Sequence, residues 1–163
     1  MSGNIEIKAY LRTDESVRRA QALADGPAVT LDQRDYFLAT DTGRLKLRVE
    51  SGRAHLIHYH RSNQPGPKYS QYVITPIEDV DSFLRDHRVL GVVEKRRCLL
   101  KIGQTRIHID EVKSLGKFLE LEVVMAPNQT QNEAKAITED LMARLSISDD
   151  DLIADAYFDL LYG

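Results

Sequence analysis

Alternating charged and apolar residues constrain the fold of this chain more than any other feature of its sequence. Every even position of the segment 44–50 is charged, from Arg44 to Glu50, and every odd position is apolar. Side chains two residues apart on a β-strand lie on the same face of the strand. The alternation therefore predicts a strand with one charged face and one apolar face.

The same pattern returns elsewhere in the chain. The segments 4–8, 105–110 and 119–123 alternate in this way, and Lys95 and Arg97 lie in phase with each other. An open antiparallel sheet with its charged face in water would explain any one of these strands. A barrel with a charged interior explains all five better, because the polar faces are crowded with Lys and Arg. We expect the charged side chains of such an interior to repel one another unless a polyanion or a metal ion offsets their charge.

The expected fold class is α+β, an eight-stranded antiparallel β-barrel with flanking helices. Short turns between neighbouring segments favour antiparallel hairpins. A capping box at Thr130 and Glu133 predicts the start of a helix that runs to Leu145. Strands are expected near 4–12, 30–38, 44–51, 54–61, 69–76, 92–102, 104–112 and 117–125. Further helices are expected from Thr13 or Asp14 to Leu23, near 79–89, and as one or two short turns after Ser148.

Composition narrows the class of protein. A chain of 163 residues is the size of one domain, and we expect residues 1–163 to form a single domain. The net charge of -3 argues against a general nucleic-acid or membrane-surface binder. Cys98 is the only cysteine, which excludes an internal disulfide and a Cys-based zinc site. We see no signal peptide and no long apolar span, so a cytoplasmic setting is expected.

Carboxylates on two distant segments suggest a metal site. Glu6 lies on one polar face together with Asn4 and Lys8, while Glu120 and Glu122 share a face far downstream. If the fold makes these segments neighbours, their oxygens would form a site for a hard divalent cation.

The order and spacing of these segments resemble a CYTH domain of the triphosphate tunnel family. That family includes class IV adenylate cyclases, thiamine triphosphatases and inorganic triphosphatases. The segment 4–8 resembles its Glu-x-Glu-x-Lys signature, and 43–48 and 95–97 resemble two of its basic strands. The segment 110–122 resembles its acidic closing hairpin. Asn4 departs from the signature, because it stands where the family has the first Glu and brings no charge.

The resemblance implies a triphosphate tunnel that uses Mg²⁺ or Mn²⁺. Its metal ligands would be Glu6, Glu120 and Glu122. Asp110 would be a metal-side or water-orienting carboxylate, and Lys8 would join these four acids in catalysis. The cations that would bind the phosphates are Lys8, Lys46, Arg48, Arg61, Lys95 and Arg97, with Arg106 as a further candidate. The sequence leaves the oligomeric state open.

The implied function is metal-dependent hydrolysis of a small triphosphate, which could be inorganic, thiamine or nucleoside triphosphate. A class IV adenylate cyclase, which converts ATP to cyclic AMP and pyrophosphate, would use the same cations. A third hypothesis is a module that binds polyphosphorylated ligands without turning them over, since Asn4 weakens the expected metal site.

Other polar residues have simpler interpretations. Asp35 is predicted to pair with a basic neighbour, and His108 to be an ordinary hydrogen-bonded histidine. His58 and His60 share a strand face but have no evident third metal ligand. The acidic run 149–151 follows Ser148 at an expected helix start, where acids favour the helix dipole.

Overall fold

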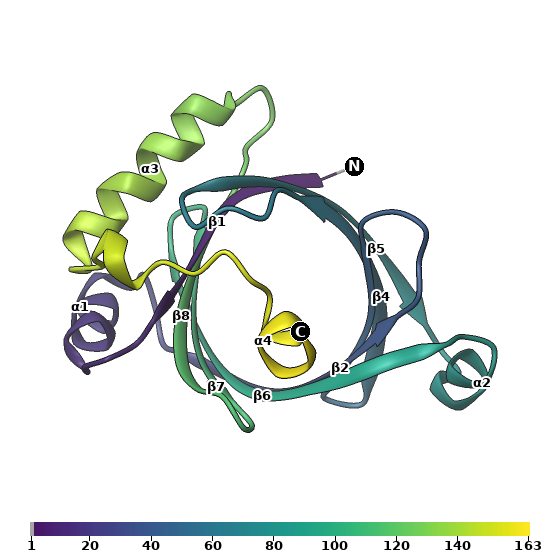
Figure 1. The fold of residues 1–163 in the computed structure, drawn as a ribbon. Helices are drawn as coiled ribbons and strands as arrows, with labels where there is room; N and C mark the ends of the chain where they lie inside the picture. Colours follow the sequence, from purple (N-terminus) through teal and green to yellow (C-terminus); the bar gives the residue numbers. More distant parts are fainter. Residues whose placement is uncertain (1) are drawn as a thin grey trace.

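The computed structural model describes residues 2–163 and contains a closed antiparallel barrel of eight strands (Figure 1). Around the wall the strands follow the order β1-β5-β4-β3-β2-β6-β7-β8, and β8 closes the barrel onto β1. The predicted α+β barrel is therefore confirmed. The strands are β1 (Ser2–Tyr10), β2 (Val29–Leu38), β3 (Arg44–Glu50), β4 (Arg53–Arg61), β5 (Lys68–Ile77), β6 (Val89–Ile102), β7 (Thr105–Val112) and β8 (Gly116–Val124).

The helices lie largely where the sequence predicts them. They are α1 (Glu15–Leu23), α2 (Val80–Arg85), α3 (Gln131–Arg144) and α4 (Tyr157–Tyr162), with a 3-10 turn at Asp149–Asp151. The helix expected near 79–89 is shorter, because Val89 already pairs with Leu38 in the β2–β6 ladder. Among the described residues, no helix is both long and apolar enough to cross a membrane.

Sequence-encoded caps start two of the helical segments. Thr130 Oγ1 accepts a hydrogen bond from the Glu133 backbone N–H, and Glu133 Oε1 accepts one from the Thr130 N–H. This reciprocal capping box confirms the predicted start of α3. Ser148 likewise caps the acidic 3-10 turn by accepting from the Asp150 N–H. The acidic run is thus a helix start, as predicted.

Most of the hydrophobic core lies outside the barrel wall. The outward face of β1, β7 and β8 presents Ile7, Ile107 and Leu121, which pack against Leu141 and Leu145 of the α3 segment. A second cluster packs α2 against the outward faces of β2, β3 and β4. Because apolar side chains cover the outer face, the alternation of each strand turns its charged side chains into the barrel.

Helix α4 is the exception, because it packs against the inner face at one end of the barrel. In Figure 1, which looks along the barrel, the yellow helix lies within the ring of strands. Phe158 stacks on Phe37 with ring centroids 4.9 Å apart, and Tyr157 packs on Phe118 at 5.0 Å. Val93 and Val112 belong to the same cluster. We call this end, lined by Phe37, Val93, Val112 and Phe118, the closed end of the barrel.

Candidate functional site

One cavity of ≈ 450 Å³ fills the barrel interior and collects most of the predicted site residues. All seven predicted phosphate-binding cations line it: Lys8, Lys46, Arg48, Arg61, Lys95, Arg97 and Arg106. The three predicted metal ligands, Glu6, Glu120 and Glu122, line the same cavity. Asp110 is only 1% exposed and contacts Arg97 and Tyr157 instead of lining the cavity.

Closure of the barrel brings the two acidic segments together. In the β1–β8 ladder, Glu6 lies directly opposite Glu122 and Lys8 lies opposite Glu120. Directly opposed residues of an antiparallel pair have side chains about 5 Å apart on the same face. The sequence suggested that these residues are neighbours but could not establish it, since Glu6 and Glu122 are 116 positions apart along the chain.

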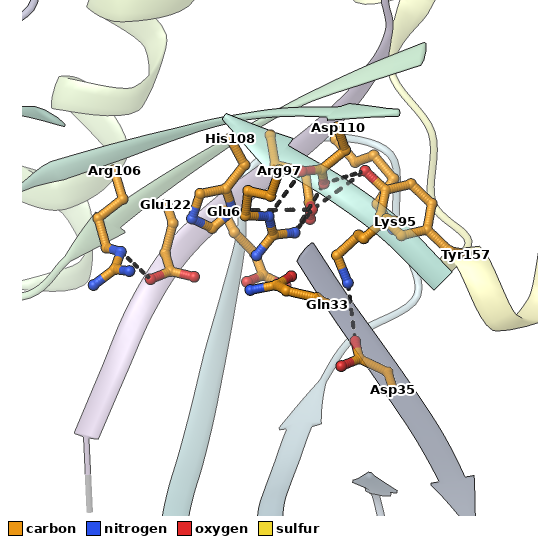
Figure 2. Close-up of polar contacts among 12 residues, drawn as sticks. Glu6, Gln33, Asp35, Lys95, Arg97, Arg106, His108, Asp110, Glu122 and Tyr157 are labelled. Carbon is orange, nitrogen blue, oxygen red and sulfur yellow. Dashed lines mark hydrogen bonds and ion pairs between the residues drawn. The ribbon is translucent and has the colours of Figure 1, made fainter. Parts of the chain in front are cut away.

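Arg97 holds two carboxylates, the buried Asp110 and the partly buried Glu120. Its guanidinium donates two hydrogen bonds of 2.8 Å to Asp110 and a third of 2.8 Å to Glu120 (Figure 2). The Tyr157 hydroxyl donates to Asp110 at 2.8 Å and also lies 3.3 Å from Glu120. Burial opposes the charge of Glu120, but Lys8 and Arg97 hold the pKa of its carboxyl well below the ordinary value. Glu120 is therefore an anion in a fixed position.

Asp35 holds three of the predicted phosphate-binding cations. It accepts two 2.8 Å hydrogen bonds from Arg48 and one of 2.9 Å from Lys95, and Lys46 Nζ lies 3.4 Å away. The prediction that Asp35 pairs with a basic neighbour is confirmed. Despite burial, these cations hold the pKa of Asp35 well below its usual range. The repulsion expected in a cationic lumen is therefore offset in part by the protein's own carboxylates.

Two lysines in this group have lowered pKa values. Burial lowers the pKa of Lys95 to about 7, assisted by repulsion from Arg48 and Arg97 and opposed by Asp35. Burial lowers the pKa of Lys46 to about 8, again with Arg48 as the main repelling neighbour. Both lysines therefore change charge close to neutral pH.

Glu6 and Glu122 form a second, less neutralised acidic pair. Glu6 accepts one hydrogen bond of 3.1 Å from Arg61, and Glu122 lies 3.8 Å from Arg106. Burial and the neighbouring Glu6 raise the pKa of Glu122. On the same face of β1, Asn4 is 3% exposed and its Oδ1 has no hydrogen-bond partner among the described residues. A cation placed here would relieve both the repulsion and the unpaired oxygen.

The oxygen donors fit a metal that is bound jointly with a substrate. Among residues 2–163, no three His, Cys, Asp or Glu side chains are arranged to hold a metal ion by themselves. Mg²⁺, however, usually takes one or two carboxylates and completes its shell with water and substrate phosphates. Glu6 and Glu122, with Glu120 beside them, match that requirement in ligand type and charge.

The sequence analysis missed two side chains that lie close to the candidate site, Lys68 and Tyr157. Lys68 is 2% exposed and donates 3.1 Å hydrogen bonds to the backbone oxygens of Gln64 and Ala154. Tyr157 lies under Lys8, whose Nζ is 4.1 Å from the ring centroid. Lys8 Nζ also donates to the Asp155 backbone oxygen at 3.1 Å. The sequence did not indicate these contacts, because the segment 153–156 is irregular and only the tertiary fold brings it and Tyr157 to the barrel interior.

His108 differs from its prediction. It is 4% exposed, its Nδ1 lies 4.0 Å from Glu120, and its Nε2 has no hydrogen-bond partner among the described residues. The prediction of an ordinary hydrogen-bonded histidine is therefore wrong. Burial and the nearby Arg97 lower the pKa of His108 well below its usual value, so the ring is neutral. A neutral, unpaired ring nitrogen in the lumen is available to a ligand.

Comparisons with known proteins agree with this geometry. The sequence matches the CYTH domain family over residues 3–157. Among proteins of curated function, none matches the sequence significantly.

Solved structures of other proteins have a similar fold. The PH1012 protein from Pyrococcus horikoshii is 23% identical, with a TM-score of 0.82 and coverage of 96% of this chain and 98% of that one. A candidate adenylate cyclase from Vibrio parahaemolyticus is 18% identical, with a TM-score of 0.76 and coverage of 98% of both chains. A candidate adenylyl cyclase from Hippeastrum with a dominant triphosphatase activity is 14% identical, with a TM-score of 0.67 and coverage of 98% and 94%. At these identities the likeness concerns the fold.

Proposed function

The chain belongs to the CYTH domain family, and on that basis we propose that it hydrolyses a small triphosphate in a metal-dependent reaction inside the barrel. The Hippeastrum protein, which has a similar fold, has a dominant triphosphatase activity. The substrates considered are inorganic, thiamine and nucleoside triphosphates.

A single observation supports this proposal most strongly. Seven cationic and three acidic side chains from six strands line one cavity, and Glu6 and Glu122 face each other across the β1–β8 ladder. A triphosphate carries several negative charges, and its hydrolysis is catalysed mainly by positioning and by neutralising charge on oxygen. A lumen of fixed cations beside a carboxylate group has the charges that such a reaction needs.

The carboxylates also explain how the cations are held in place before a substrate arrives. Asp35 fixes Arg48 and Lys95, and Asp110 fixes Arg97 with two hydrogen bonds. Each of these cations keeps further N–H groups that are free to donate to phosphate oxygens. Because the protein has already oriented them, little reorganisation is needed when negative charge develops on the substrate.

The acids would hold the metal and guide the nucleophile. Glu6, Glu120 and Glu122 are the residues that would hold Mg²⁺ or Mn²⁺, which supplies charge neutralisation on the phosphate oxygens and lowers the pKa of water. Tyr157 orients Glu120 through its hydroxyl, and Arg97 keeps the same carboxylate ionised. Asp110 orients Arg97 and Tyr157, which is a supporting task and not direct contact with the ligand.

Asn4 provides a test of the metal site. We expect Asn4→Glu to tighten Mn²⁺ binding in the presence of a triphosphate by at least about tenfold, because it adds a charge beside Glu6. Asn4→Gln has the length of Glu without its charge and is the matched control. Calorimetric titration of Mn²⁺ measures the difference. Equal affinities for the Glu and Gln variants would place position 4 outside the coordination sphere.

The weak lysine charges predict a pH dependence of binding. Lys95, with a pKa of about 7, is protonated below that pH and neutral above it. We expect triphosphate affinity to fall as pH rises through 7, by up to about tenfold per pH unit for each proton taken up on binding. Lys95→Met should flatten this slope when the affinities are measured by calorimetry. Comparing the variant with the unmodified protein also corrects for protonation of the ligand itself. An unchanged slope would remove Lys95 from the binding site.

Protein stability should follow the opposite trend. The unfolded chain keeps its lysines protonated up to about pH 10.4. Between pH 7 and that value the unfolded state therefore binds more protons than the folded state at Lys95, and stability rises with pH. Loss of ligand affinity over this range cannot then be ascribed to unfolding.

A panel of substrates tests the proposed function and its two alternatives. The protein is incubated with Mg²⁺ or Mn²⁺ and with inorganic, thiamine or adenosine triphosphate. Orthophosphate, pyrophosphate and cyclic AMP are measured in parallel. Hydrolysis predicts orthophosphate, with or without pyrophosphate, and no cyclic AMP. Equal amounts of cyclic AMP and pyrophosphate from ATP would identify an adenylate cyclase, and binding without any product would identify a binding module.

A further inference from the structure

Buried polar atoms without a partner gather in the barrel interior. Among the described residues, four buried side-chain atoms have no hydrogen-bond partner: Asn4 Oδ1, Gln33 Oε1, Arg106 Nε and His108 Nε2. All four residues line the lumen cavity. Leaving a buried polar atom unpaired costs free energy, so four such atoms around one cavity indicate that a ligand completes their bonding.

The strand ladders place one of these atoms beside the expected metal ligands. His108 lies directly opposite Glu120 in the β7–β8 ladder, and Arg106 lies opposite Glu122. His108 is therefore a diagonal neighbour of Glu122, and diagonal neighbours on one face are within reach of aromatic and long side chains. In Figure 2 the His108 ring and the Glu122 carboxylate point into the same part of the lumen. Glu6 faces Glu122 from the other side, on β1.

The surroundings of the His108 ring leave a lone pair on Nε2. Its Nδ1 lies 4.0 Å from Glu120 Oε1, the oxygen that also accepts a hydrogen bond from Arg97. An anion on this side favours the tautomer that carries its proton on Nδ1. Nε2 is then an acceptor, which repels phosphate oxygens and attracts a cation or a hydrogen-bond donor. Histidines that bind metals commonly have this arrangement, with a carboxylate facing the other ring nitrogen.

A metal ion between β1, β8 and β7 would satisfy several of these groups at once. Glu6 and Glu122 supply carboxylate oxygens, Asn4 an unpaired amide oxygen and His108 an unpaired nitrogen. The described side chains form no cluster of three that would hold an ion by itself. Phosphate oxygens of the substrate would therefore have to complete the coordination shell, as in the proposed function.

A nitrogen ligand changes which metal the site prefers. Mg²⁺ is a hard cation that takes oxygen ligands and demands near-ideal octahedral geometry. Imidazole is a ligand of transition metals, whose affinities for sites with nitrogen and oxygen donors rise along the series from Mn²⁺ to Cu²⁺. A site of carboxylates alone would not favour a transition metal to the same extent.

We propose that His108 binds the metal ion through Nε2, together with Glu6 and Glu122, and that the site consequently prefers Mn²⁺ over Mg²⁺. This inference rests on the proposed function, because it takes the metal ion and the triphosphate to bind together in the lumen. It adds a nitrogen ligand from β7 to the carboxylates of β1 and β8.

Pulsed electron paramagnetic resonance of Mn²⁺ tests the nitrogen ligand directly. The protein is mixed with Mn²⁺ and inorganic triphosphate and frozen at once, and the electron spin echo is examined for modulation by a directly bound nitrogen nucleus. We expect this modulation in the unmodified protein, so the first result does not depend on any variant. It should disappear in His108→Gln, which offers an amide in place of the ring, and equally in His108→Asn.

His55→Gln is the matched control. His55 also lines the cavity, but its strand β4 is four strands from β7 in either direction around the barrel. Its nitrogen modulation should equal that of the unmodified protein. Calorimetric titrations in the presence of triphosphate give a second readout. His108→Gln should lower the ratio of Mn²⁺ to Mg²⁺ affinity by about tenfold, and His55→Gln should leave that ratio unchanged.

The possible outcomes separate the two proposals. If Mn²⁺ binds with triphosphate but shows no nitrogen modulation, or if the modulation persists in both His108 variants, His108 is not a ligand and the proposed function stands. If the modulation depends on His108 but no triphosphate is hydrolysed, the nitrogen ligand stands and the proposed function fails. If Mn²⁺ does not bind in the presence of triphosphate, both proposals fail.

Discussion

Replacing Arg97 with Met is expected to destabilise the protein by about 3–5 kcal/mol, because it leaves the buried Asp110 and the partly buried Glu120 without the guanidinium that hydrogen-bonds both. Arg97 makes three 2.8 Å hydrogen bonds to Asp110 and Glu120, and Asp110 is 1% exposed. A lumen in which cations only repel one another would respond in the opposite way and gain stability. Chemical denaturation of the two proteins measures the difference in unfolding free energy.

The adjacent arginine on the outer face is the control. Arg96 pairs with Asp32 at 3.0 Å, but its side chain is 68% exposed. Arg96→Met should change stability by no more than about 1 kcal/mol, as is usual for a surface ion pair. Adding Asp110→Asn to Arg97→Met should recover part of the loss, because it removes one of the two stranded charges. Equal stabilities of the Arg96 and Arg97 variants would contradict the charge pairing described for the lumen.

Replacing Glu120 with Gln is expected to lower triphosphate turnover by at least about a hundredfold, the scale of losing one preorganised charged group. Gln keeps the volume of the side chain, and Arg97 keeps both bonds to Asp110, so the fold should persist. Ligand binding in EDTA should survive through the cations. The readout is kcat at saturating metal and substrate, with a parallel metal titration.

Glu111→Gln is the matched control for this variant. Glu111 is exposed on β7, in the opposite phase to Asp110, and its loss removes the same charge from the protein. Its turnover should equal that of the unmodified protein. If Glu120→Gln and Glu122→Gln both keep full turnover, the β8 carboxylates have no part in the reaction.

The sequence predicted the barrel because its signal is local. Alternation along 44–50 or 119–123 assigns each side chain to a face, whatever strand lies beside it. The strand face on which Lys46, Arg48 and Glu120 lie could therefore be predicted from the sequence. Pairing between strands is not local, so the opposition of Glu6 and Glu122 needed the closed barrel.

Lys68 and Tyr157, which the sequence analysis missed, have no such local signal. Lys68 begins β5 directly after a Pro- and Gly-containing loop, and Tyr157 follows an irregular stretch. Their positions depend on how the last residues pack into the closed end. His108 was assigned to the correct face but not to its environment, since the number of hydrogen-bond partners in a lumen depends on every strand around it.

The lumen is better described as a set of internal ion pairs than as an excess of positive charge. Asp35, Asp110 and Glu120 each hold cations that phosphate would also bind. These carboxylates lower the cost of keeping the barrel folded without a ligand, and they fix the cations in position. A ligand must therefore gain its affinity from N–H groups that the ion pairs leave free.

The most direct test of triphosphate hydrolysis in the lumen is a single-turnover reaction followed by phosphorus NMR. The protein is held in excess over inorganic or nucleoside triphosphate, so that even one slow turnover is visible. We predict that the triphosphate signals disappear in Mg²⁺ or Mn²⁺, that orthophosphate appears, and that EDTA prevents both changes. A triphosphate that binds in the presence of either metal and stays intact would contradict the proposed hydrolysis.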